Sequence, residues 1–234
     1  MKKNLFTSLI AFIMCLASCS FVSKDFDTSD KDSLVIQLIT YVLDQAHYLD
    51  KEIDDDFSEK VFDTFLENLD PYKRYFYATD IQEFSKYKYK IDDAFKNPNF
   101  DFFDLVYSRY IERMSESEKI FNKVLSTPFD FSKDEVCECD FDVLEYVQTN
   151  DELYDRWRKL LKIYVIENYH NEIEDDKRKL EKDSLFQIRN LKVIEKETRE
   201  SLSETMTQNY RFVSEEMQRS DWLSVYINSF LSQY

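Results

Sequence analysis

Thiols and imidazoles are the side chains in this sequence whose types could bind a metal ion or act as nucleophile and base. Cys137 and Cys139 stand two positions apart in the segment EVCECDF. That spacing is too short for an easy disulfide, and the second pair of ligands that a zinc site needs is missing. His47 and His170 lie far from the thiols in the sequence, each within a helical pattern. We therefore expect no metal site, structural histidines, and either plain thiols or a strained or intermolecular disulfide.

The chain of 234 residues contains no glycine, which excludes several kinds of catalytic and ligand-binding loop. Phosphate-binding loops, dinucleotide-binding turns and nucleophile elbows depend on the close backbone approach or the positive φ angles that glycine allows. Serines and lysines are both numerous, so single residues do not exclude a Ser-Lys dyad, but no serine stands in a motif typical of a nucleophile. The sequence predicts no catalytic residue and no cofactor.

Acidic residues outnumber basic ones by 47 to 31, which gives the chain a net charge of -16. With so many carboxylates, a catalytic pair of acids cannot be recognised from their number, and most of them are expected on a solvated face. An acidic surface repels DNA, RNA and anionic lipid headgroups. We therefore expect no nucleic acid among the partners of this protein.

Residues 1–18 have the pattern of a secretory signal peptide, with two lysines, an apolar run too short to span a bilayer, and small residues at the end. The segment Leu16-Ala17-Ser18-Cys19 resembles a bacterial lipobox, in which the cysteine becomes the lipidated first residue of the mature chain. An ordinary cleaved signal peptide with a chance cysteine is the alternative. Residues 19–33 are polar and acidic and are predicted to form a tether. The expected location is the bacterial cell envelope, facing the periplasm or on the surface, with anchoring through Cys19.

Beyond the tether, apolar residues recur at helical spacing, and the lack of glycine for tight hairpins disfavours an extensive β-sheet. We expect an all-α domain over residues 34–234, a multi-helix domain of amphipathic helices with one long irregular loop at 127–150. Pro71, Pro98 and Pro128 all fall between the predicted helices. Those helices cover approximately residues 34–46, 59–69, 79–96, 102–125, 150–183, 185–218 and 221–234.

Capping residues indicate where these helices begin. The acidic run 54–56 precedes the second helix, and N-capping explains it better than calcium binding, because a calcium loop needs spaced ligands and a glycine. The other predicted starts are Asp32 or Ser33, the capping boxes Thr79 with Gln82 and Thr149 with Glu152, and Ser220-Asp221.

Four aromatic residues, Tyr72, Tyr75, Phe76 and Tyr77, lie between the second and third predicted helices. They are open to two interpretations, a platform for carbohydrate or peptide, and packing between helices. The second is favoured, because aromatic side chains supply most of the buried area at such contacts.

The same stretch carries a resemblance to a known family. Its pattern LDP…YF…DI.EF resembles the junction in the N-terminal helical domain of tail-specific proteases, also called carboxy-terminal processing peptidases. The residues concerned are Leu69, Asp70, Pro71, Tyr75, Phe76, Asp80, Ile81 and Phe84. Further matches follow in the same order along the chain, at 91–97, 109–114, 128–131 and 152–162, the last of which contains Trp157.

The resemblance implies a non-catalytic domain. In the family, a peptide-binding PDZ domain and a protease core with a Ser-Lys dyad follow the helical domain, and neither has a counterpart in residues 1–234, so no catalytic residue is carried over. The implied role is to support proteolysis by packing on the protease core and recruiting partners such as an adaptor lipoprotein. The alternative is a stand-alone lipoprotein adaptor or binding module. Packing on a core predicts an exposed apolar surface on the segment Trp222 to Tyr234.

Overall fold

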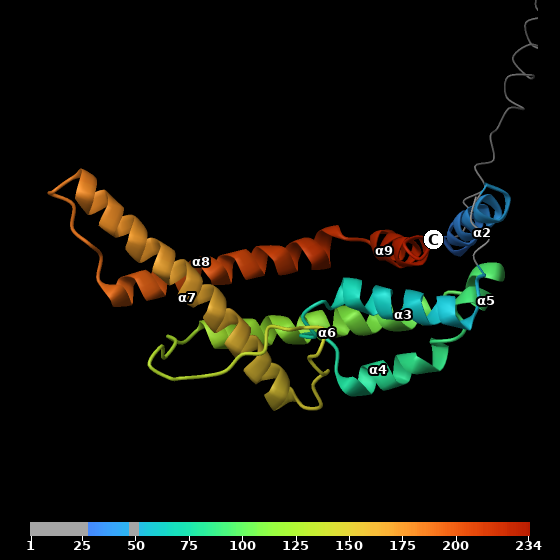
Figure 1. The fold of residues 1–234 in the computed structure, drawn as a ribbon, viewed down its shortest axis with the longest axis horizontal. Coiled ribbons are helices and arrows are strands. Elements are labelled where there is room, and N and C mark those ends of the chain that lie inside the picture. The colour runs from blue at the N-terminus through green and yellow to red at the C-terminus, as the bar shows by residue number, and fades with distance from the viewer. Residues whose placement is uncertain (1–27, 47–51) are drawn as a thin grey trace, which may run out of the picture.

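The computed structural model of the protein describes residues 28–46 and 52–234, and this part of the chain is all-α, as predicted (Figure 1). Short 3₁₀- and π-helical turns follow α4 and α8, at Ser85–Tyr87 and Phe212–Glu216. No strand occurs among the described residues, which contain one isolated parallel bridge between Tyr77 and Val147. The helices are α2 (Thr28–Ala46), α3 (Asp55–Leu69), α4 (Ala78–Phe84), α5 (Ile91–Lys96), α6 (Asp101–Leu125), α7 (Asn150–Lys182), α8 (Leu191–Arg211) and α9 (Arg219–Leu231).

Helix α6 runs parallel to the long axis of the molecule, and α7 crosses it at a steep angle (Figure 1). α6 packs against α4, α7, α8 and α9, while α3 packs against α5 and α9. α8 and α9 follow one another along the side of α6. α3, α6 and α9 turn apolar faces inward, and α7 does so with its first half, as expected for amphipathic helices around a single core.

Aromatic rings fill the centre of this core. Tyr226 of α9 lies with its ring centroid 5.0 Å from that of Phe65 in α3 and 5.8 Å from that of Phe103 in α6. Phe230, one turn later, stacks on Phe95 of α5 at 3.6 Å. The contacts therefore join α9 to α3, α5 and α6, which all lie far from α9 in the sequence.

The burial of α9 corrects one prediction. Trp222, Tyr226 and Phe230 are all buried inside the domain, so the expected exposed apolar surface on the last segment is wrong. An apolar stripe in a sequence shows that a face is covered, but it does not show which element covers it. Here α3 and α6 cover the face.

Several helix boundaries also differ from the predictions. α2 begins at Thr28, inside the segment expected to be a tether, so the start predicted at Asp32 or Ser33 is wrong. The third predicted helix divides into α4 and α5. α4 begins at Ala78 with Tyr77 as its N-cap, where Asp80 accepts from the Tyr77 N–H, so the predicted start at Thr79 with Gln82 is wrong. α8 begins only at Leu191.

Other boundaries are confirmed. Asp54 caps α3 by accepting a hydrogen bond from the backbone N–H of Phe57 at 3.0 Å, and Thr149 caps α7 through the N–H of Glu152 at 3.3 Å. The stretch between Leu125 and Asn150 contains no helix, in agreement with the predicted irregular loop. We call residues 126–149 the long loop.

Candidate functional site

The residues that carry the family resemblance meet where α3 turns into α4, and we call residues 69–84 the junction. Asp70 ends α3 and is only 1% exposed. Its Oδ1 accepts a hydrogen bond from the N–H of Arg74 at 2.8 Å, and its Oδ2 accepts from Tyr75 and Phe76 at 2.9 and 3.0 Å. Burial raises the pKa of the Asp70 carboxyl, while the three N–H donors and the Arg74 charge act in the opposite direction. One buried carboxylate therefore fixes the backbone of the turn.

Lys73 has the backbone conformation that glycine usually supplies. Its φ angle of 45° lies in the left-handed region, which costs a residue with a side chain roughly 1 kcal/mol or more. Its N–H donates to the carbonyl of Asp70 at 3.0 Å, and its ammonium group donates to the carbonyl of Leu144 in the long loop. These bonds offset the strain and attach the long loop to the junction.

Helix α7 holds the other side of the turn. The indole N–H of Trp157 donates to the carbonyl of Arg74 at 2.8 Å, and the guanidinium of Arg156 donates to the carbonyl of Lys73. The Arg74 guanidinium lies 4.7 Å from the Trp157 ring centroid, within cation–π range. Because Trp157 is fully buried, these contacts couple α7 rigidly to the junction.

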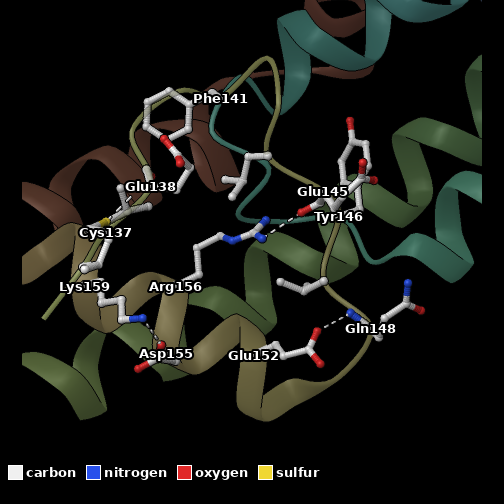
Figure 2. Close-up of a pocket in the computed structure, with 14 residues that line it drawn as sticks. Cys137, Glu138, Phe141, Glu145, Tyr146, Gln148, Glu152, Asp155, Arg156 and Lys159 are labelled. Atoms are coloured by element: carbon white, nitrogen blue, oxygen red, sulfur yellow. Dashed lines mark hydrogen bonds and ion pairs between the residues drawn. The ribbon is translucent and has the colours of Figure 1, made fainter.

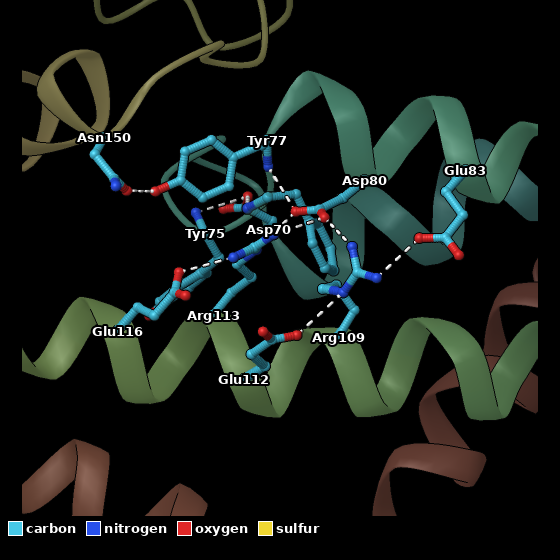
Figure 3. A network of polar contacts seen from close by, with 11 residues as sticks. Asp70, Tyr75, Tyr77, Asp80, Glu83, Arg109, Glu112, Arg113, Glu116 and Asn150 are labelled. Atoms are coloured by element: carbon cyan, nitrogen blue, oxygen red, sulfur yellow. Dashed lines mark hydrogen bonds and ion pairs between the residues drawn. The ribbon is translucent and has the colours of Figure 1, made fainter.

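Asp80 is the centre of a second polar network, drawn in Figure 3. Its side chain is fully buried, and Arg113 of α6 binds both of its oxygens, with N–O distances of 2.8 and 2.9 Å. Arg109 donates to the same carboxylate and also pairs with Glu83 at 2.8 Å. Burial alone would raise the pKa of Asp80, but the hydrogen bonds from Arg113, from the Tyr77 N–H and from Arg109 hold it below its usual value. The network fixes α4 on α6.

The long loop is bound to the junction near its end and to α7 through Glu135. At its end, the N–H of Ala78 donates to the carbonyl of Val147 at 2.9 Å. Near its start, Glu135 pairs with Arg158 and Lys162 of α7, each at 2.6 Å. The hydrogen bonds from these two cations lower the pKa of Glu135 to about 2. The loop is therefore an ordered cover over α7 despite having no regular structure.

A cavity of about 500 Å³ lies between the long loop and α7 (Figure 2). Arg156 crosses it to donate to the carbonyl of Glu145 at 2.7 Å, and Lys159 turns back to Asp155 at 2.8 Å. Cys137 stands on its wall, where burial and the neighbouring Cys139 thiol raise its pKa. A nucleophilic cysteine needs a lowered pKa, so the cavity does not have the chemistry of a cysteine active site.

The remaining chemical candidates lie apart from the junction. His170 is exposed on α7, while His47 and Cys19 lie outside the described residues. The part of the chain that the structure describes holds no group of three or more His, Cys, Asp or Glu side chains placed to bind a metal ion. Within residues 28–46 and 52–234, no helix combines the length and hydrophobicity needed to cross a bilayer.

The structure brings the family-motif residues together as packing and tying groups. Tyr75, Phe76 and Tyr77 are buried and Tyr72 is half-buried against Phe141 of the long loop, so the packing interpretation of the aromatic cluster is confirmed over an exposed platform. Ile81 is half-buried and Pro71 is exposed at the turn. The buried members of the motif are Leu69, Asp70, Tyr75, Phe76, Asp80, Phe84 and Trp157.

Sequence reasoning missed the arginines that bind the junction. Arg109 and Arg113 stand four positions apart in RYIERM, a spacing that places both on one face of α6. That spacing was the available signal, since a buried carboxylate such as Asp80 requires cationic partners. Arg156 gave no such signal, because its partners are backbone carbonyls.

Comparison with known proteins supports the family resemblance. The family model of the tail-specific protease N-terminal domain matches residues 39–234. The chain is also similar to the tail-specific protease of Haemophilus influenzae, with 34% identity over 100 residues. That match covers 41% of this chain and 14% of the relative, so the chain spans only a small part of the relative's length.

Proposed function

The chain belongs to the tail-specific protease N-terminal domain family, and on that premise we propose that it is the non-catalytic helical domain of an envelope tail-specific protease. In this role it supports proteolysis by packing on a PDZ-containing protease core and by recruiting partner proteins. Cleavage would belong to the core, and the helical domain would supply a rigid frame around it.

One observation carries this proposal: the polar side chains of the junction are engaged in holding helices together. Asp70 binds three backbone N–H groups, Asp80 binds two arginines of α6, and Trp157 binds a backbone carbonyl. A catalytic acid or base must instead have a proton-transfer path to a substrate. The motif is therefore better suited to rigidity than to chemistry.

The hydrogen bonds of three serine hydroxyls also favour a structural role. Ser58 donates to the carboxylate of Asp92 at 2.8 Å, and Ser85 and Ser229 donate to carbonyls of their own helical turns. A nucleophilic serine must be open to its substrate and needs both a general base and an oxyanion hole, whereas Ser58 is fully buried. These bonded serines serve as structural groups.

The envelope location is a second part of the proposal. It is supported by the signal-peptide pattern of residues 1–18 and by Cys19 at the lipobox position. A lipid on Cys19 would keep the helical domain close to a membrane surface. Mass spectrometry of the mature N-terminal peptide tests it, with an acylated Cys19 as the expected result.

A stand-alone lipoprotein adaptor is the second candidate, and the burial of α9 favours it. The apolar face of α9 packs within the domain and leaves no open apolar surface at Trp222 and Tyr226. A domain that covers this face by itself has less need of a protease core for stability. The two candidates differ in the partner that they predict.

A peptidase assay separates them. The purified chain alone is expected to leave peptides with apolar C-termini intact. Mixed with or joined to the PDZ–protease polypeptide of the same organism, it is expected to bind that core and to raise kcat/KM for such peptides at least tenfold. Turnover by the chain alone would contradict the non-catalytic role. A protease core that neither binds the chain nor changes its activity when the chain is added would favour the stand-alone lipoprotein adaptor.

A further inference from the structure

Helix α2 has two apolar faces, of which one is packed on the domain. Ile36 is fully buried on this inner face, and the Thr40 hydroxyl lies 3.4 Å from the carbonyl of Phe95 in α5. Asp32 pairs with Arg219 at the start of α9. These contacts fix the orientation of α2, and with it the direction of its opposite face.

The opposite face is apolar and exposed. Its members recur at positions i, i+1, i+4, i+7 and i+8, which places them within about 120° of arc at 3.6 residues per turn. No aspartate or glutamate interrupts them between residues 34 and 42. The five side chains, which we call the α2 stripe, are Leu34 (60% exposed), Val35 (46%), Leu38 (59%), Tyr41 (63%) and Val42 (48%).

The sequence before α2 indicates what covers this stripe. Residues 20–27 alone separate Cys19 from the start of α2 at Thr28. At no more than about 3.6 Å per residue, this segment keeps the start of α2 within roughly 30 Å of a lipid attached to Cys19. An apolar helix face so close to a lipid anchor has the bilayer surface as its nearest apolar environment.

The net charge of the protein favours zwitterionic lipids over anionic lipids as the surface that covers the stripe. The chain carries a net charge of -16, so anionic headgroups repel it, whereas an uncharged stripe is compatible with zwitterionic headgroups. Interfacial helices usually expose a charged face to water, but here the domain covers that side of α2. Tyr41 has the ring and hydroxyl that favour the boundary between headgroups and acyl chains.

We propose that α2 lies on the surface of a zwitterionic bilayer, with the α2 stripe at the level of the headgroups. This inference rests on the proposed envelope anchoring, and it adds a second point of membrane contact to the lipid on Cys19. Two contacts would fix the orientation of the domain on the membrane, because Asp32, Ile36 and Thr40 join α2 firmly to the body.

Tryptophan fluorescence tests the proposal. The variant Leu38→Trp places a probe in the stripe, and the native Trp157 and Trp222 are buried, at 0% and 7% exposure, and serve as a constant background. The matched control is Leu185→Trp, at a position that is 87% exposed in the turn between α7 and α8. Tyr41→Trp provides a second probe in the stripe if Leu38→Trp fails to fold by circular dichroism.

The full chain, expressed with its leader and processed by the cell, is reconstituted into vesicles of phosphatidylcholine brominated on its acyl chains. Bromine is expected to reduce the emission of the stripe probe at least twofold, and that of the control probe not measurably. A stripe probe that bromine leaves unquenched overturns the proposal. Acrylamide then distinguishes a stripe open to water from one covered by a protein partner or a second copy.

Mass spectrometry of the same sample keeps the two proposals apart. Acylated protein with an unquenched stripe probe contradicts membrane contact by α2 but leaves the anchoring proposal intact. Protein without an acyl chain contradicts anchoring through Cys19. When that protein is mixed with the same vesicles, quenching of the probe still reports contact between the α2 stripe and the bilayer. Quenching in that mixture supports the α2 contact, and its absence contradicts it.

Discussion

Replacing Asp80 by asparagine tests the view that the junction is a structural tie. The substitution keeps the shape of the side chain but removes its charge, while Arg109 and Arg113 remain in place with only 23% and 16% of their side chains exposed. Breaking a buried ion pair by removing one partner typically costs 3–5 kcal/mol. Each arginine keeps a second carboxylate partner, Glu83 or Glu116, at 2.8 and 2.9 Å, which reduces the loss. We expect Asp80→Asn to lower the free energy of unfolding by about 3 kcal/mol.

Urea denaturation and thermal unfolding measure this effect. In a domain of this size the loss corresponds to a decrease in Tm of about 6–12 °C. The matched control is Glu116→Gln, which removes a 38% exposed partner of the same Arg113 and is expected to cost less than about 1 kcal/mol. Equal and small losses for the two variants would refute the reasoning that the buried carboxylate holds α4 on α6.

The pH dependence gives an independent check. Because the pKa of Asp80 is lowered in the folded state from 3.8, the unfolded state binds more protons as the pH falls below that value. The stability that ionised Asp80 contributes is therefore present above about pH 4 and is lost as the pH falls through the folded-state pKa. The difference in stability between the native chain and Asp80→Asn should shrink in this acidic range, and a constant difference would contradict the assignment.

Three further predictions concern other buried or reactive groups. Tyr226→Phe is expected to raise the free energy of unfolding by about 1 kcal/mol in urea denaturation, because the buried hydroxyl has no hydrogen-bond partner among the described residues; a loss of more than 1 kcal/mol would contradict it. Asp70→Ala is expected to lower that free energy by about 3 kcal/mol or more, since three backbone N–H groups lose their acceptor, and an unchanged urea midpoint would rule this out. Iodoacetamide at pH 8 is expected to alkylate Cys139 faster than Cys137 in peptide mapping, because Cys139 is exposed and burial raises the pKa of Cys137. The reverse order would contradict the conformation of the long loop around the two thiols.

Local patterns in the sequence were sufficient to predict the fold class and most of the helices, but not how the helices pack. The all-α class followed from helical periodicity and the lack of glycine, and Asp54 and Thr149 cap helices as predicted. The start of α4 was missed because two overlapping capping patterns compete there. Thr79 with Gln82 fits the usual sequence preference, but Asp80, buried against α6, accepts from the N–H of Tyr77 and makes Tyr77 the N-cap.

The ties of the junction could not be predicted in full, because they join residues that are distant in sequence. Asp80 was chosen as a family-motif residue, yet its partners Arg109 and Arg113 lie in another helix. The apolar face of α9 posed the same difficulty, because helical periodicity identifies an apolar face but not the helices that pack against it. Trp157 was identified from the family resemblance, and its bond to the carbonyl of Arg74 became visible only in three dimensions.

We propose that this chain is the supporting domain of a protease, and the partner that it has in its own host decides whether it is. The most direct test is purification of the native protein from its own host with an antibody to residues 52–234, followed by mass spectrometry of everything retained in stoichiometric amount. We expect peptides from a PDZ domain and a Ser-Lys protease core, either in the same polypeptide or in an equimolar partner. A stoichiometric partner without such domains, or a pure chain that cleaves peptides by itself, would contradict it.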